Sequence, residues 1–95
     1  KEIKKILCIS VNDPFVMDNW GKIHNVGNKI LMVGDSNATF TKNIGAEVNL
    51  HNRGLGIRSS RYSMLVEKGI ITKIKEEETA GKCENTAAEN FIKEI

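Results

Sequence analysis

The fold class is decided by residues 6–34, which read ILCISVNDPFVMDNWGKIHNVGNKILMVG. Ile6–Val11 and Lys29–Gly34 are short and nearly continuous apolar runs, typical of strands that are buried on both faces of a parallel sheet. Between them, Asp13 as N-cap and Pro14 at the first helical position mark the start of a helix. A strand, a helix and a strand within about 30 residues predict a right-handed, parallel βαβ unit.

The helix of this unit is expected to be amphipathic and to end within Asn25–Asn28, a segment that contains a glycine. Three residues form its predicted apolar stripe and two more lie beside it: Val16, Trp20 and Ile23, then Met17 and His24.

A second, shorter helix is predicted downstream of the βαβ unit. Ser36 or Asn37 can cap it, and it runs through Ile44 until Gly45 stops it. The following stretch, Ala46–Ser60, is rich in Gly, Asn and Arg and is expected to be a loop.

A β-hairpin is predicted next, with strands Tyr62–Glu67 and Ile70–Lys75 joined at Lys68-Gly69. The second strand alternates apolar and polar residues, so one of its faces should meet water. The acidic run Glu76–Glu78 is expected to be a solvated strand end.

The last predicted element is a helix that begins with the capping box Thr86–Glu89. Its apolar stripe comprises Ala88, Phe91, Ile92 and Ile95. The order β-α-β-α-loop-β-β-α favours an α/β fold with a thioredoxin-like sheet.

Composition sets the outer limits on size and function. The chain has 95 residues, 40% hydrophobic and 27% charged, which is typical of one small globular domain. A net charge of +2 is too weak to indicate nucleic-acid binding, and no apolar run approaches the roughly 18 residues of a membrane span. Two distant cysteines do not form a disulfide scaffold, so a reducing compartment is expected.

The usual site motifs are weak in this sequence. The candidate metal ligands Cys8, His24, His51 and Cys83 have no ligand-like spacing, so a metal site is not expected. Gly54-Leu55-Gly56 precedes a strand and does not open a helix, which argues against dinucleotide binding. Ser10, Asp13 and His24 have the residue types of a catalytic triad, but nothing else in the sequence supports one.

Arginines and cysteines offer better candidates. Arg53, Arg58 and Arg61 crowd into the segment that leads to the hairpin. Arg61, at the mouth of its first strand, either is a surface residue or holds a thiolate and a substrate oxygen. Cys8 lies in a buried strand, where cysteine is usually inert. Cys83 lies beside a lysine and a helix start, which would favour its thiolate.

Three longer motifs stand out: CISVNDPFVM (8–17) with Trp20-Gly21, MVGD (32–35) with Phe40, and GLGIRSSRYSM (54–64), followed by the hairpin and the last helix. In these segments the chain resembles type II peroxiredoxins, the atypical two-cysteine thiol peroxidases. The resemblance covers essentially the whole chain in order. It implies a thioredoxin-like peroxiredoxin fold, here incomplete, with a βαβ unit, a short helix, a β-hairpin and a C-terminal helix.

The resemblance also implies roles for three residues. Arg61 matches the arginine that binds and polarises the peroxide. Cys8 matches the resolving cysteine of plant-like members, and Cys83 lies about two residues from that of animal members, which makes it the second candidate.

One family feature is missing. The peroxidatic cysteine of the family lies in a Pro-x-x-x-Thr-x-x-Cys segment, and neither Cys8 nor Cys83 has that context. The chain also begins at Lys1 without a methionine. We therefore expect residues 1–95 to be the C-terminal part of a single peroxiredoxin domain, inactive by itself. The segment upstream would supply the strand between the Ile6 and Tyr62 strands, whose unpaired backbone groups would otherwise be costly.

For the complete protein the resemblance implies thiol-dependent reduction of hydrogen peroxide or alkyl hydroperoxides without a cofactor. Thioredoxin, glutaredoxin or glutathione would be the reductant and a homodimer the assembly. The compartment would be the cytoplasm, or a mitochondrion or plastid. Two alternatives remain for the chain itself: a short non-enzymatic module that self-associates through exposed sheet edges, and a residual redox protein in which Cys83 cycles with a small thiol.

Overall fold

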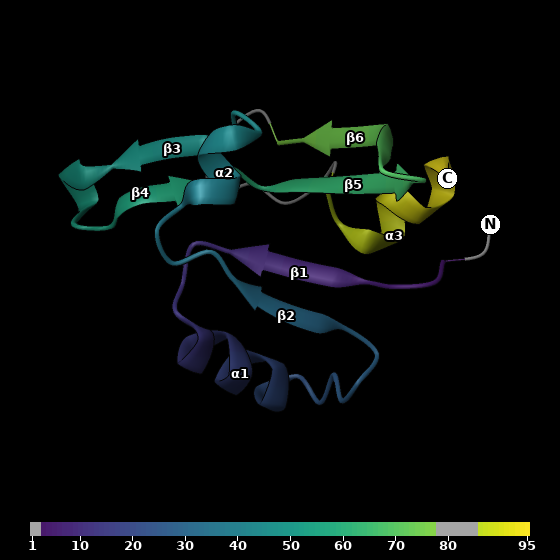
Figure 1. The fold of residues 1–95 in the computed structure, drawn as a ribbon, viewed down its shortest axis with the longest axis horizontal. Coiled ribbons are helices and arrows are strands. Elements are labelled where there is room, and N and C mark those ends of the chain that lie inside the picture. Colours follow the sequence, from purple (N-terminus) through teal and green to yellow (C-terminus); the bar gives the residue numbers. More distant parts are fainter. Residues whose placement is uncertain (1–2, 78–85) are drawn as a thin grey trace. The chain divides into compact units, whose positions relative to one another are not determined.

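The computed structural model describes residues 3–77 and 86–95. It divides into two compact units, residues 1–59 (unit one) and residues 60–95 (unit two). The elements are drawn in Figure 1 and follow in this order: β1 (Leu7–Ser10), α1 (Pro14–Ile23), β2 (Leu31–Gly34), α2 (Thr39–Asn43), β3 (Glu47–Leu50), η1 (His51–Arg53), β4 (Gly56–Ser59), β5 (Tyr62–Glu67), β6 (Ile70–Glu76), α3 (Ala88–Phe91) and η2 (Ile92–Glu94).

The predicted βαβ unit is confirmed. β1 and β2 pair in parallel, with Leu7 opposite Leu31 and Ser10 opposite Gly34. α1 connects them, and its start is the predicted one: the carboxylate of Asp13 accepts a hydrogen bond from the Val16 amide at 2.8 Å.

The buried face of α1 differs from the predicted stripe. Met17 and Gly21, one turn apart, are the buried residues of this helix. A Cβ atom on Gly21 would lie only 2.9 Å from Cγ of Met32, so α1 packs on β2 where its smallest residue allows the closest approach. The three residues of the predicted stripe are exposed instead: Val16, Trp20 and Ile23.

The prediction that the two parallel strands are buried on both faces is also wrong for this chain. Ile6, Leu7 and Leu31 are each more than half exposed. β1 and β2 form a sheet of two strands in the part of the chain that the structure describes, and α1 packs on β2. Two strands and one helix bury too little surface to enclose every apolar side chain of the strands.

The second helix begins differently from the prediction. Its N-cap is Ala38, in a left-handed conformation (φ 59°), rather than Ser36 or Asn37. Asp35 supplies the oxygen acceptors for its first turn. Gly45, with φ of 73°, ends the helix as predicted, because glycine adopts a positive φ without strain.

The segment predicted to be a loop, Ala46–Ser60, contains two antiparallel strands. β3 and β4 pair with Glu47 opposite Ser59 and Leu50 opposite Gly56. The turn η1 and Gly54, at φ 72°, connect them. The glycines that suggested an open loop make this turn possible, since both Gly54 and Gly56 have positive φ.

The predicted hairpin is confirmed in unit two. β5 and β6 are antiparallel, and Lys68 and Gly69 both have positive φ, as a two-residue type I′ turn requires. One face of β6 is more exposed than the other, as expected, but the more exposed face carries Ile74. Lys73 and Lys75 are half-buried on the face where Glu94 binds them.

The capping box predicted for the last helix does not form. The N-cap of α3 is Ala87, and its side chain makes no capping hydrogen bond. Thr86 instead bonds the carboxylate of Glu77, so Glu77 is not part of a solvated strand end; Glu78 lies outside the described residues. Phe91 is the buried residue of the predicted apolar stripe, while Ile92 is largely exposed.

The strands form three separate pairs, β1–β2, β3–β4 and β5–β6, within the described residues. Few apolar side chains are buried among the described residues: Val11, Met17 and Ala38 in unit one, and Phe91 in unit two. No helix in residues 3–77 and 86–95 is long and apolar enough to cross a membrane.

Candidate functional site

Arg61 lies immediately before β5 and its side chain is exposed. Its carbonyl oxygen accepts a hydrogen bond from the Glu77 amide at 3.1 Å, one step beyond the last register pair of β5 and β6, Tyr62 and Glu76. The backbone of Arg61 is therefore held by the hairpin ladder, and its guanidinium can reach a ligand from a rigid base.

Thr86 closes the same end of the hairpin. Its amide and its hydroxyl each donate to Oε2 of Glu77 at 2.8 Å, and its carbonyl oxygen accepts from the Ser63 hydroxyl at 2.5 Å. Thr86 is 8% exposed, so these bonds satisfy a buried polar residue. This group of three residues, the Thr86 network, fixes the start of α3 to both strands next to Arg61.

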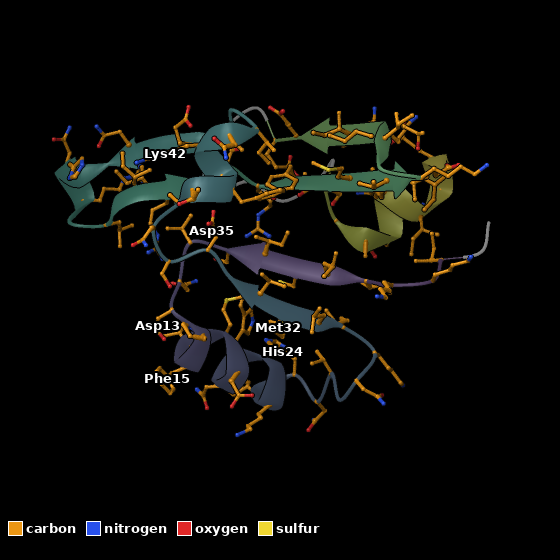
Figure 2. The ribbon with its side chains drawn as sticks, in the orientation of Figure 1. Asp13, Phe15, His24, Met32, Asp35 and Lys42 are labelled. Carbon is orange, nitrogen blue, oxygen red and sulfur yellow. The ribbon has the colours of Figure 1, made fainter. Side chains whose placement is uncertain are left out.

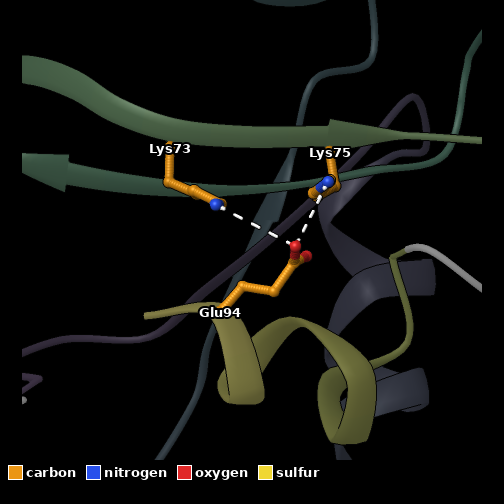
Figure 3. Close-up of polar contacts among 3 residues, drawn as sticks. All are labelled: Lys73, Lys75 and Glu94. Atoms are coloured by element: carbon orange, nitrogen blue, oxygen red, sulfur yellow. Dashed lines mark ion pairs between the residues drawn. The ribbon is translucent and has the colours of Figure 1, made fainter.

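The other end of the C-terminal helix is bound to β6 by charge, as Figure 3 shows. One carboxylate oxygen of Glu94 lies 3.3 Å from Nζ of Lys75 and 4.0 Å from Nζ of Lys73. All three side chains are more than one-third exposed, so each pair contributes at most about 1 kcal/mol. The two ion pairs orient the helix more than they stabilise the unit.

Cys8 lies on β1 and is half-buried, opposite Met32 on β2. Burial raises the pKa of its thiol above the ordinary value. A thiol whose pKa is raised carries less thiolate at neutral pH, so this environment favours an unreactive cysteine. Cys83, the other sequence candidate, lies outside the described residues.

A cavity of about 400 Å³ opens beside Cys8. We call it the Cys8 pocket; its lining consists of Cys8, Trp20, His24, Val26, Ile30 and Met32. The ring of His24 meets that of Trp20 edge to face, with 6.5 Å between centroids. In Figure 2, Met32 on β2 and His24 at the end of α1 both border this space.

Asn12 organises the polar residues at the end of β1. Its amide nitrogen donates to the Ser10 hydroxyl at 2.8 Å, and its amide oxygen accepts from Nη2 of Arg58 at 3.0 Å. The bond to Arg58 joins β4 to the β1–α1 connection within unit one. Sequence reasoning missed Asn12; the only available signal was a polar residue directly after a strand.

The structure does not assemble the triad of Ser10, Asp13 and His24. Asp13 caps α1 through the Val16 amide, and the Ser10 hydroxyl is bonded to Asn12. His51 begins η1, on the β3–β4 turn. No group of three or more His, Cys, Asp or Glu side chains that could hold a metal ion occurs among the described residues.

The three arginines lie on different elements. Arg53 lies in η1, Arg58 on β4 with its side chain on Asn12, and Arg61 in unit two before β5. Cys8 belongs to unit one. Sequence reasoning also missed Glu77 as a support of the Arg61 end of the hairpin, because an acidic run at a strand end is usually solvated.

Comparison with known proteins agrees with this arrangement. The sequence matches the family described as Redoxin over residues 1–92. Peroxiredoxin-2E, chloroplastic, of Arabidopsis thaliana is 38% identical over all of this chain, which spans 41% of that protein. Peroxiredoxin-2D of the same plant is 37% identical, and the chain spans 58% of it.

The solved structures give the same result. Reduced Prx3 from Vibrio vulnificus in complex with H₂O₂ matches with a TM-score of 0.88 and 37% identity, over 97% of this chain and 56% of that one. The chain thus spans about half the length of the relatives it matches. It belongs to the redoxin family, with the thioredoxin-like fold of the peroxiredoxins that are its relatives.

Proposed function

We propose that this chain supplies the peroxide-binding arginine and a candidate resolving cysteine of a thiol-dependent peroxidase, with residues 1–95 forming the C-terminal part of one thioredoxin-like domain. The observation that carries the proposal is Arg61, an exposed guanidinium on a backbone held by the β5–β6 ladder and the Thr86 network. A relative of the same fold is bound to H₂O₂ in its crystal, which supports a hydroperoxide as substrate.

In the proposed reaction a cysteine thiolate attacks one oxygen of the hydroperoxide. The sulfur–oxygen bond forms as the oxygen–oxygen bond breaks, and the leaving alkoxide or hydroxide takes up a proton to become an alcohol or water. The cysteine is left as a sulfenic acid. Arg61 donates hydrogen bonds to the peroxide and stabilises both the thiolate and the charge that develops on the leaving oxygen.

The attacking thiolate belongs to the family segment Pro-x-x-x-Thr-x-x-Cys, which does not occur in these 95 residues. The sulfenic acid is then resolved by a second thiol, which forms a disulfide and releases water. Cys8 is the first candidate for this thiol and Cys83 the second. Burial raises the pKa of the Cys8 thiol, so little of it is thiolate at neutral pH in this structure.

A thioredoxin, a glutaredoxin or glutathione returns the disulfide to two thiols, and the working assembly is a homodimer. We place the protein in the cytoplasm, with a mitochondrion or plastid as the alternative; one relative is named as chloroplastic. The non-enzymatic module considered from the sequence is disfavoured, because the relatives that match the whole chain are peroxiredoxins.

The test is a chimera in which residues 1–95 replace the matching part of Prx3 from Vibrio vulnificus. Arg61→Ala is expected to lower peroxide turnover by about two to three orders of magnitude, as loss of a donor to a developing oxyanion does. Arg53→Ala, on the β3–β4 turn, is the matched control and should leave turnover unchanged. Melting curves establish that the three proteins are folded to the same extent.

Turnover by the folded Arg61→Ala chimera equal to that of the unmodified chimera would overturn the proposal. An unmodified chimera that melts cooperatively but reduces no peroxide would overturn it as well. For the resolving role, Cys8→Ser should leave the first sulfenic acid formation intact and slow disulfide formation, followed by mass spectrometry.

A further inference from the structure

The Cys8 pocket gathers three soft donor atoms from three different elements. Cys8 contributes a thiol from β1, Met32 a thioether from β2 and His24 an imidazole from the C-cap of α1. The sequence separates these residues by up to 24 positions, with no metal-binding spacing between them. Only the parallel pairing of the two strands beneath α1 brings them to one cavity.

The register places the two sulfur-bearing residues as direct neighbours. Cys8 and Met32 are partners in the parallel pair, so their side chains leave the sheet on the same face, from strands about 4.8 Å apart. That face is the one covered by α1, because Cγ of Met32 lies against Gly21 of the helix. Side chains that leave neighbouring strands on the same face can both turn toward one ion, whose bonds to sulfur are about 2.3 Å long.

The third donor lies where the pocket meets solvent. His24 is exposed and its ring rests edge-on against Trp20, which also lines the pocket. Met32 and Cys8 are half-buried behind it. His24 is therefore the most exposed of the three donors that line the pocket, and Figure 2 shows it together with Met32.

The chemistry of the lining selects the kind of ion. Among the described residues, no carboxylate lines the pocket, so hard cations such as Mg²⁺ or Ca²⁺ find no suitable ligand in this lining. Thiolate and thioether sulfur favour monovalent copper, and imidazole is a good additional ligand for it. Val26 and Ile30, which also line the pocket, are apolar and offer no competing polar group.

We propose that the Cys8 pocket is a binding site for monovalent copper, held by Sγ of Cys8, Sδ of Met32 and one ring nitrogen of His24. On binding, a copper–sulfur bond replaces the sulfur–hydrogen bond of Cys8 and the proton leaves to solvent; the copper stays monovalent throughout. Arg61 has no part in this site, whereas Cys8 is also the first candidate for the resolving thiol of the proposed peroxidase reaction.

The experiment titrates the 95-residue chain with Cu(I) under anaerobic conditions, in competition with a coloured Cu(I) chelator. Emission of Trp20, the only tryptophan, reports on the pocket. We expect one tight equivalent, with quenching of Trp20. Cys8→Ser, Met32→Leu and His24→Gln are each expected to weaken binding by roughly tenfold or more.

The chain provides a matched control for each ligand, since it has a second cysteine, and also a methionine and a histidine that do not line the pocket: Cys83→Ser, Met64→Leu and His51→Gln. These variants should bind as the unmodified chain does. In concentrated urea, the difference between His24→Gln and His51→Gln should vanish, because only the fold assembles the site.

Two results would overturn the proposal. Unchanged affinity in both Met32→Leu and His24→Gln would show that the thiol alone takes up the ion. Equal losses in Cys8→Ser and Cys83→Ser would show that the pocket does not select the cysteine.

Discussion

Asp35 lies outside α2, but its side chain accepts hydrogen bonds from the first turn of that helix. Its Oδ2 accepts from the amide and the hydroxyl of Thr41, at 2.8 and 2.7 Å, and its Oδ1 accepts from the Phe40 amide at 3.2 Å. These hydrogen bonds, the one from the Thr41 side chain first, hold the pKa of Asp35 below its usual value of 3.8. Thr41 is 1% exposed, so without Asp35 its hydroxyl would lack this acceptor.

Asp35→Ala should therefore destabilise unit one by roughly 1–3 kcal/mol, the cost of a buried hydroxyl without its partner. Since the pKa is lowered in the folded state, the charged carboxylate contributes its full stability above the unfolded-state pKa. That contribution is lost as the pH falls from near 3.8 through the folded-state pKa. Urea unfolding at neutral and at acidic pH measures both effects.

Asp18→Ala is the control for this prediction. Asp18 pairs with Lys22 on the surface of α1 at 2.9 Å, and both side chains are more than two-thirds exposed. Its loss should cost less than about 0.5 kcal/mol. Equal losses in the two variants at neutral pH would contradict the role assigned to Asp35.

The Cys8 thiol gives a second prediction at the residue scale. In a Cys83→Ser background, alkylation of Cys8 by iodoacetamide at neutral pH should be slower in the folded chain than in the same chain unfolded in urea. Burial both raises the pKa of the thiol and restricts access to it. Mass spectrometry of timed samples gives the two rates, and a faster reaction in the folded chain would refute the prediction.

At the scale of elements, two glycines decide how closely the parts of the βαβ unit approach. A Cβ atom on Gly34 would lie 2.7 Å from the backbone oxygen of Asn12, next to the start of α1. A Cβ atom on Gly21 would instead meet the side chain of Met32, which can rotate away. The contact at Gly34 is with backbone, which cannot move aside. The contact at Gly21 is with a side chain, which can change its rotamer.

Gly34→Ala is therefore expected to destabilise the chain by roughly 1–3 kcal/mol, as overpacking against backbone does. Gly21→Ala should cost less, because alanine also favours the helix by about 1 kcal/mol relative to glycine. Chemical denaturation monitored by circular dichroism compares the two variants. A larger loss for Gly21→Ala would mean that Met32 is as rigid as backbone.

At the scale of the whole molecule, the chain leaves many large apolar side chains in contact with solvent. Phe15 is 84% exposed, and Ile23, Ile70 and Ile92 are each about two-thirds exposed. Few side chains are fully enclosed in the described residues. So small a core leaves little net stability after the entropy of ordering 95 residues.

The isolated 95-residue chain should accordingly bind the dye ANS and unfold at low urea concentration. Exposed apolar surface binds the dye, and a small core gives a low free energy of unfolding. Reduced Prx3 from Vibrio vulnificus, at equal protein concentration, is the reference. Dye emission from the chain no higher than from the reference would contradict this account of its surface.

Much of the architecture was predictable because its signals are local. The start of α1 at Asp13-Pro14 and the Lys68-Gly69 turn each depend on residues that are adjacent in sequence, and the parallel pair β1–β2 belongs to one short βαβ unit. The same is true of Arg61, which is recognisable from its immediate neighbours. Its role remains a prediction that the chimera tests.

Other features could not be predicted, because they depend on partners far apart in the chain. The sequence did not predict β3 and β4, because the glycines between them are typical of loops as well as of turns. Asp35 caps α2 from outside the helix, and Glu77 binds Thr86 nine residues away. A local sequence pattern shows which polar groups need a hydrogen-bond partner. It does not show which of several distant side chains will provide one.

The sequence by itself determined most of the element types and the βαβ unit, because hydrophobic periodicity, caps and turn residues act over a few positions. Its motifs carried the resemblance to the peroxiredoxins. Only the tertiary structure decided that Met17 and Gly21 form the buried face of α1. It also decided that Cys8 and Met32 share a pocket with His24. Strand register and close packing determine these contacts, and both depend on how complete helices and strands pack against one another.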